Sequence, residues 1–170
     1  MSIGEVQAQP SPLTPELIQK FQALTRVQRG ELAKKYSDSQ IFKQLGFKDG
    51  KDAFTYCGVV QKARLEKNTE LTGFAPNING NGMEQEQALI KSKIDGCFVQ
   101  LPPLVEQGYW SMGEFEELAK KYTSEFLAAH NNVQADKGQK LGQMVTLADR
   151  VAKTVLETSS KFIAEEMRKR

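Results

Sequence analysis

The chain has 170 residues, of which 39% are hydrophobic and 26% charged, and its formal net charge is +2. This composition is ordinary for a globular protein that buries its own core, and two cysteines are too few for a disulfide framework. No stretch approaches the roughly 18 apolar residues of a membrane span, and the first residues lack the basic and apolar regions of a signal peptide. We therefore expect a cytoplasmic protein, or one exported by a signal-independent route.

The charged residues are unevenly distributed along the chain. Residues 26–67 carry ten basic and five acidic side chains, residues 84–128 carry eight acidic and four basic, and residues 129–170 carry eight basic and five acidic. Blocks of this kind are typical of solvated helix faces and of segments that dock on one another. A basic face that binds a partner is the alternative interpretation.

Helix start signals follow an extended Pro/Gln-rich arm over residues 1–13. Thr14 is expected to cap a first helix, because Pro15 fits the first helical position. Thr25 and Gln28 have the spacing of a capping box that opens a second helix.

Two further helices are expected before the first strong break in the chain. Ser37 or Asp38 is predicted to cap a short third helix, which Gly46 ends. Asp52 is predicted to cap a fourth helix, whose inward stripe includes Phe54 and Cys57. These helices together make a basic N-terminal lobe over residues 14–72.

An Asn/Gly-rich loop over residues 73–82 is expected to separate this lobe from a second one, residues 83–170. The second lobe begins with a predicted helix over residues 83–94. Residues 97–101 are expected to be extended, because two prolines follow them. Another capping box, Ser111 with Glu114, opens the next helix.

The last part of the chain predicts one long amphipathic helix, about residues 136–168. Leu141, Ala148, Val155 and Phe162 recur there every seven residues, and other apolar side chains widen the stripe beyond a strict coiled-coil seam. The fold expected is therefore all-α, a bundle of about six or seven helices packed along this C-terminal helix.

Metal chemistry has few candidate ligands in this sequence. His130 is the single histidine, and the two cysteines lack metal-ligand spacing. Asn77, Asn79 and Asn81 have the oxygen spacing that opens a calcium loop, but amides replace the usual carboxylates and Ala88 stands where a bidentate Glu belongs. We predict no cofactor and keep these three asparagines as a weak calcium candidate.

A cysteine nucleophile is one enzymatic hypothesis. Cys57 lies near the start of a predicted helix, where the dipole would lower the pKa of its thiol. Cys57, His130 and Asn131 resemble papain-like hydrolases in their chain order. The alternative is that Cys57 is a small core residue. Reduced thiols are the default expectation, and a single Cys57–Cys97 disulfide is left open.

Nucleic-acid binding is a second hypothesis, based on residues 37–67. The turn from Leu45 to Asp49 reads Leu-Gly-Phe-x-Asp, which resembles the second helix-turn-helix of arabinose-activator-type regulators. Phe54 falls one place late for that pattern. The resemblance implies a DNA-binding regulator, in which the cations placed to contact phosphates are Lys48, Lys51, Lys62 and Arg64.

Protein–protein contact is the function that the sequence favours. Gly138 and Gly142 each cost a helix about 1 kcal/mol relative to alanine, which is easier to understand where another helix approaches closely. Tyr109 and Trp110 form an aromatic pair suited either to anchor a partner or to plug the bundle. We therefore predict a non-enzymatic protein that binds a protein partner or a second copy, as an assembly component or an exported factor. The further candidate contacts are the basic end, Arg168, Lys169 and Arg170.

Overall fold

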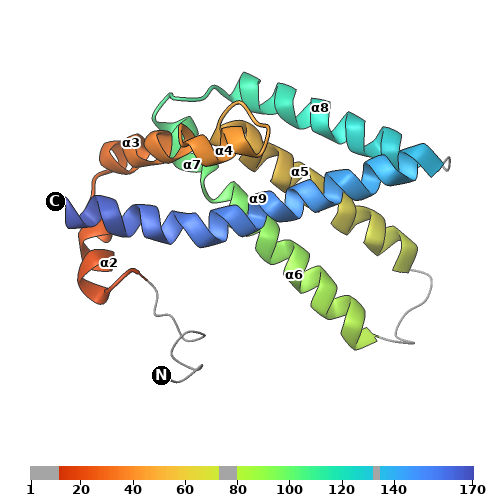
Figure 1. Cartoon of the computed structure of the whole chain (residues 1–170), viewed down its shortest axis with the longest axis horizontal. Helices are drawn as coiled ribbons and strands as arrows, with labels where there is room; N and C mark the ends of the chain where they lie inside the picture. Colours follow the sequence, from red (N-terminus) through yellow and green to blue (C-terminus); the bar gives the residue numbers. More distant parts are fainter. Residues whose placement is uncertain (1–11, 73–79, 132–134) are drawn as a thin grey trace.

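The computed structural model describes residues 12–72, 80–131 and 135–170, and gives only the backbone path over 68–72, 80–84 and 135–138. These residues form eight α-helices and no strand, which confirms the all-α fold (Figure 1). No helix among them is both long and apolar enough to cross a membrane. The helices are α2 (Pro15–Gln22), α3 (Arg26–Ser37), α4 (Gln40–Gln44), α5 (Gly50–Thr72), α6 (Gly80–Phe98), α7 (Leu101–Glu106), α8 (Met112–Asn131) and α9 (Ala135–Arg168).

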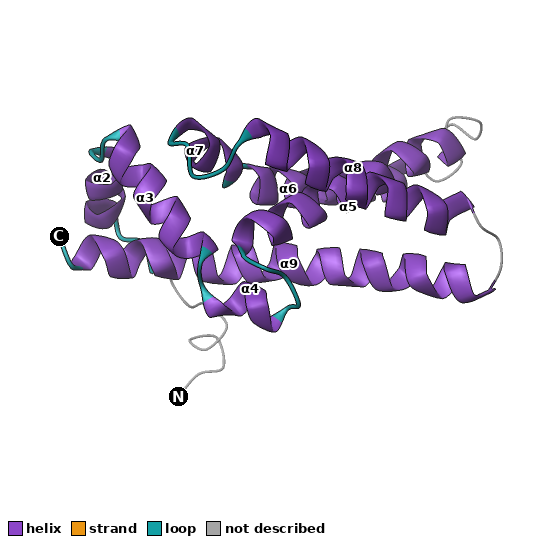
Figure 2. Cartoon of the chain, turned by 90° about the horizontal axis from the view of Figure 1, so that it is seen from above, coloured by secondary structure: helices purple, strands orange, loops and turns teal. Residues whose placement is uncertain are grey.

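Helix α9 runs the length of the molecule, as the seven-residue repeat predicts. It has 34 residues and contacts α5, α6 and α8, as well as α2 and α3 near the C-terminus (Figures 1 and 2). Ala148 and Val155 are buried, and Leu141 and Phe162 pack against the same core. The predicted stripe is therefore the face by which α9 joins the bundle.

Helix α5 is buried more completely than α9. Every residue from Ala53 to Gln61 is buried, because α3, α6, α8 and α9 all contact this helix. A helix that is apolar on all sides fits the centre of a bundle, so the single inward stripe predicted for this segment was too narrow. The main core joins residues of α3 to α5 with residues of α6 to α9, so the two predicted lobes share one hydrophobic core.

Three of the predicted caps are formed. The Thr14 hydroxyl accepts a hydrogen bond from the Leu17 amide at 3.3 Å. Thr25 and Gln28 make both bonds of a capping box. Ser111 and Glu114 also bond in both directions at the start of α8, at 3.1 and 3.3 Å. Gly46, with φ of 95°, ends α4 as predicted, because a positive φ suits glycine.

Other helix boundaries were wrong. Helix α4 begins after Ser39 rather than after Ser37 or Asp38. Helix α5 begins at Gly50, where the Asp49 carboxylate accepts the Asp52 amide at 3.0 Å. Asp52 is therefore inside the helix, and Asp49 is the cap. Short polar residues crowd both junctions, so several could serve as the cap.

The predicted extended segment over residues 97–101 was also wrong. Helix α6 begins at Gly80 and continues to Phe98, and α7 begins at Leu101 after a short turn. Pro102 and Pro103 lie in the first turn of α7, where the missing amide hydrogens cost nothing. The prolines start a helix here instead of following an extended strand.

A smaller core holds the C-terminal end of α9 against α2 and α3. It contains the buried residues Leu17, Leu24, Leu32, Ala164 and Met167. The Lys35 ammonium pairs with Glu166 and lowers the pKa of that carboxyl, chiefly through this hydrogen bond. Because the pKa of Glu166 is lower in the folded chain, the pair stabilises the fold at pH values above the ordinary pKa of a carboxyl. This stabilisation is lost as the pH falls through the folded-state pKa.

Two helical glycines differ in the space around them, so alanine substitutions at the two positions should change stability in opposite directions. A Cβ at Gly58 would overlap the Phe98 ring, whereas a Cβ at Gly142 would meet nothing within 4 Å. We expect Gly142→Ala to raise the free energy of unfolding by up to about 1 kcal/mol. Gly58→Ala should lower it, since overpacking a core costs about 1–3 kcal/mol. Urea unfolding of both variants checks this, and equal shifts in one direction would contradict it.

Candidate functional site: an apolar groove along α9

The structure places Cys57 where it cannot act as a nucleophile. Its side chain is buried and bonded to Cys97 in a disulfide. His130 lies near the end of α8, its ring stacked on that of Phe126 with 6.0 Å between centroids, and its Nδ1 is 3.4 Å from the Asn131 side chain. The Cys57–Cys97 disulfide that the sequence left open is therefore present. The hydrolase hypothesis requires a free Cys57 thiol, which this disulfide removes.

The helix-turn-helix interpretation requires an exposed recognition helix, and α5 is instead the central helix of the core. Arg64 pairs with Glu86 at 2.9 Å, so it is engaged within the fold. Lys48 and Lys62 are exposed. Lys48 and Lys51 line a hollow of about 450 Å³ in which four acidic side chains face three lysines, an unfavourable surface for phosphates. The charged lining is Lys48, Asp49, Lys51, Asp52, Glu114, Glu117 and Lys121.

Trp110 takes the plugging role rather than the anchoring one. It is only 2% exposed, its ring meets Phe115 edge-on at 5.6 Å, and the Lys51 ammonium lies 5.8 Å above it. Tyr109 is half-buried against the main core. A tryptophan in this position stabilises the bundle and offers no surface to a partner.

The remaining predicted contacts lie apart from one another or outside the described residues. Gly142 is exposed, and Gly138 lies where only the backbone path is described. Arg168, Lys169 and Arg170 are exposed at the C-terminus, where Lys20 donates to the Arg170 carbonyl at 3.3 Å. Their role in binding a partner stays a prediction. Of the calcium candidates, Asn77 and Asn79 lie outside the described residues, and Asn81 is in the first turn of α6.

Sequence reasoning missed a pair of neighbouring apolar pockets beside α9. The first is a hollow of about 500 Å³ between α6 and α9. Three of its aliphatic side chains are largely exposed: Leu89 by 55%, Val99 by 61% and Leu156 by 79%. Side chains of this size usually gather inside a protein, so three around one hollow form an exposed apolar patch.

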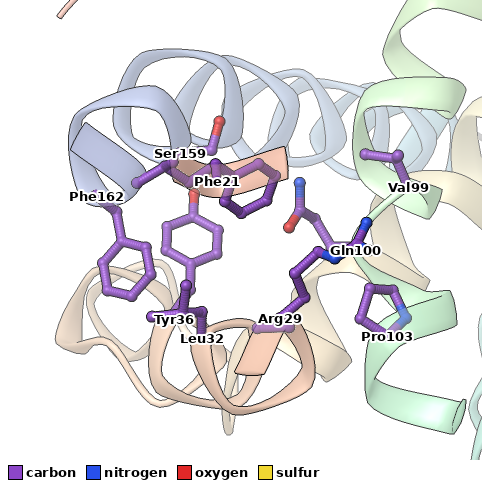
Figure 3. Close-up of a pocket in the computed structure, with 11 residues that line it drawn as sticks. Phe21, Arg29, Leu32, Tyr36, Val99, Gln100, Pro103, Ser159 and Phe162 are labelled. Atoms are coloured by element: carbon purple, nitrogen blue, oxygen red, sulfur yellow. The ribbon is translucent and has the colours of Figure 1, made fainter. Parts of the chain in front are cut away.

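The second pocket has about 310 Å³ and lies between α2, α3, α9 and the turn before α7. In Figure 3 the rings of Tyr36 and Phe162 lie on one side, with Arg29, Gln100 and Val99 on the other. The Tyr36 hydroxyl is hydrogen-bonded to Thr158 at 2.7 Å, which fixes the ring in the wall. The pocket is therefore lined by a rigid aromatic wall and a more polar one.

The two pockets adjoin each other beside α9, and we call the pair the α9 groove. Both are lined by Val99, Gln100 and Ser159. On α9 the groove extends from Asp149 to Ile163, about 21 Å at 1.5 Å per residue. Its floor on α9 consists of Asp149, Ala152, Lys153, Val155, Leu156, Ser159, Phe162 and Ile163.

A polar cluster fixes the N-terminal end of the α9 groove. Asp149 accepts hydrogen bonds from Gln61 of α5 at 2.6 Å and from Lys93 of α6 at 2.8 Å, and Arg64 lies 3.9 Å away. Gln61 is fully buried, and its carbonyl oxygen has no hydrogen-bond partner among the described residues. These bonds fix the position of α9 relative to α5 and α6. The hollow between α6 and α9 is therefore part of the folded structure.

The charged side chains that line the α9 groove are mostly basic. They are Arg29, Lys93 and Lys153 against one acid, Asp149. Among the described residues, no group of three His, Cys, Asp or Glu side chains is placed to hold a metal ion. The groove is therefore suited to binding by apolar contact with basic edges.

No protein-family model, curated protein or solved structure matches this chain. By its fold the chain is an all-α bundle, and an exposed apolar groove lies along its longest helix. Only the α9 side of the groove has a signal in the sequence. Ala152 and Ser159 lie seven residues apart on α9, as do Leu156 and Ile163.

Proposed function

We propose that this protein is a non-enzymatic helical protein that acts through protein–protein contacts, and that the α9 groove is its binding surface. The observation that carries the proposal is the exposure of Leu89, Val99 and Leu156 around one concave surface. Binding surfaces for proteins combine an apolar centre with a polar rim. The groove has this arrangement, with Arg29 and Lys153 among its lining charges.

Two settings fit this function, as a component of a larger assembly or as a factor exported without a signal peptide. The Cys57–Cys97 disulfide supports the exported alternative, because structural disulfides persist mainly in oxidising compartments. A groove that is already formed in the free chain is compatible with both settings, since a preformed surface loses less conformational entropy on binding.

Site-specific photo-cross-linking tests the proposal. A photoreactive side chain replaces Leu156 in the groove, or Val27, which is 54% exposed on α3 and does not line the groove. In an extract of the native source, we expect a protein adduct from position 156 that is absent from position 27. Equal labelling at both positions, or none at position 156, would show that the groove is not the binding surface.

A further inference from the structure

We propose that the α9 groove binds one amphipathic α-helix with acidic flanks, contributed by a partner protein and laid along α9. This inference rests on the proposed function and adds the shape and charge of the partner. It follows from three properties of the groove: its spacing, its length and its lining charges.

The spacing of the groove floor on α9 indicates a helical occupant. Asp149, Ala152, Leu156, Ser159 and Ile163 stand 3, 4, 3 and 4 residues apart along α9. This is the a/d pattern that receives the side chains of a second helix as knobs into holes. An extended peptide would match the period of two residues found in strands instead, and the described residues of this chain offer it no strand edge.

The length of the groove sets the size of the occupant. About 21 Å of α9 lies in the groove, which corresponds to a helix of about 14 residues. Other helices flank α9 along the groove, with Leu89 and Lys93 of α6 at one pocket and Phe21 and Leu32 of α2 and α3 at the other. A single helix of four turns can bury its apolar face against all of them, as in other helix-in-groove complexes.

The charges select an acidic helix. Lys153 lines the pocket nearer Asp149, and Arg29 lines the pocket nearer Ile163. The lining carries three cations and one carboxylate, so its net charge is positive, although Glu157 lies 3.9 Å from the Lys153 ammonium. A helix that carries Glu or Asp beside its apolar seam meets cations in both pockets, whereas a basic helix is repelled there.

A second copy of this chain fits the groove less well. A two-fold contact through the groove is self-complementary, so each residue meets the same patch of the other copy. Lys153 and Arg29 of one copy would then face the same basic lining in the other. Like charges across an interface oppose association, and this favours a separate protein as the source of the helix.

Two synthetic peptides of about 14 residues serve as probes. Both carry leucine at a and d, with glutamate at the flanking positions of one and lysine at those of the other. Fluorescence anisotropy with the full chain should give an affinity for the glutamate peptide at least about tenfold higher, since two or three exposed charge pairs supply about 1.4 kcal/mol. Equal affinities, or a preference for the lysine peptide, would overturn the acidic assignment.

Matched substitutions locate the binding. Leu156→Gln removes an exposed groove side chain without changing charge, and we expect a loss of at least about tenfold in glutamate-peptide affinity. Val27→Gln, at a position that is 54% exposed and outside the groove, should leave the affinity unchanged. Lys153→Glu should narrow the preference between the peptides, and Lys161→Glu, an exposed position outside the groove, should not. Equal effects within either pair would contradict binding in the groove.

The outcomes separate this inference from the proposed function. If neither peptide binds but position 156 gives its specific cross-link, the helical occupant is wrong and the binding surface stands. If both tests fail, both proposals are wrong. Sedimentation equilibrium tests whether a second copy of the chain occupies the groove. A dimer that dissociates in the Leu156→Gln variant but not in the Val27→Gln variant would assign the groove to a second copy.

Discussion

Reduction of the Cys57–Cys97 disulfide will lower the free energy of unfolding by about 4 kcal/mol, the loop-closure value for cysteines 40 residues apart. The bond joins α5 to the C-terminal part of α6, and both sulfurs are buried. Reducing the disulfide removes a constraint on the unfolded chain. The unfolded state then gains conformational entropy, which favours unfolding. A typical domain has only about 5–15 kcal/mol of stability, and this loss is a large part of it.

Urea unfolding with and without a reductant measures the effect. Because both sulfurs are buried, the chain must be unfolded in the presence of reductant and then refolded before the comparison. A Cys57→Ala/Cys97→Ala double variant is the control, since its stability should not respond to reductant. A reduced chain as stable as the oxidised one would show that the bond does not constrain the unfolded state.

One contact should offset part of this loss. The Cys57 sulfur lies 3.4 Å from the Ala148 carbonyl of α9, and a reduced thiol there can donate a weak hydrogen bond. The double alanine variant cannot form it. We therefore expect the reduced wild-type chain to be somewhat more stable than the variant.

Three capping signals in the sequence predicted helix starts correctly, whereas no signal in the sequence placed α5 at the centre of the bundle. Capping depends on three or four neighbouring residues, so Thr25 and Gln28, and likewise Ser111 and Glu114, are readable from spacing. The burial of α5 depends on which helices surround it. The apolar run from Ala53 to Val60 was visible in the sequence, but its role as the central helix follows only from contacts with α3, α6, α8 and α9.

The candidate site shows the same limit more strongly. The α9 groove brings together Phe21, Leu89 and Ile163 from three separate parts of the chain, and no local pattern specifies that juxtaposition. Aromatic character alone also misleads, because it cannot distinguish Trp110 as a core plug from Trp110 as an anchor. Burial decided the question, and the exposed residues that matter are aliphatic.

At alkaline pH the folded state should lose stability steeply because of three buried tyrosines. Burial raises the pKa of Tyr36, and hydrogen bonding to Thr158 offsets this in part. Burial and then the Glu125 charge raise the pKa of Tyr56 to about 12. Burial, followed by the hydrogen bond that Tyr122 donates to Asp52, raises the pKa of Tyr122. Each of the three phenols is therefore held neutral by the fold.

The sign of the effect follows from proton linkage. Above about pH 10 the unfolded chain releases phenolic protons that the folded chain retains, so stability falls as the pH rises. Each tyrosine contributes about 1.4 kcal/mol per pH unit between its unfolded and folded pKa values. Three tyrosines give a slope of up to about 4 kcal/mol per pH unit, enough to unfold a typical domain within a few units.

Tyr56→Phe isolates the contribution of one of these phenols. Its hydroxyl donates to the Met144 carbonyl at 3.2 Å, so its removal should cost about 1 kcal/mol at neutral pH. Above about pH 10 the variant should lose stability less steeply than the wild type, by about 1.4 kcal/mol per pH unit. Urea unfolding at several alkaline pH values measures both slopes. Parallel slopes would mean that the Tyr56 phenol ionises as readily in the fold as in the unfolded chain.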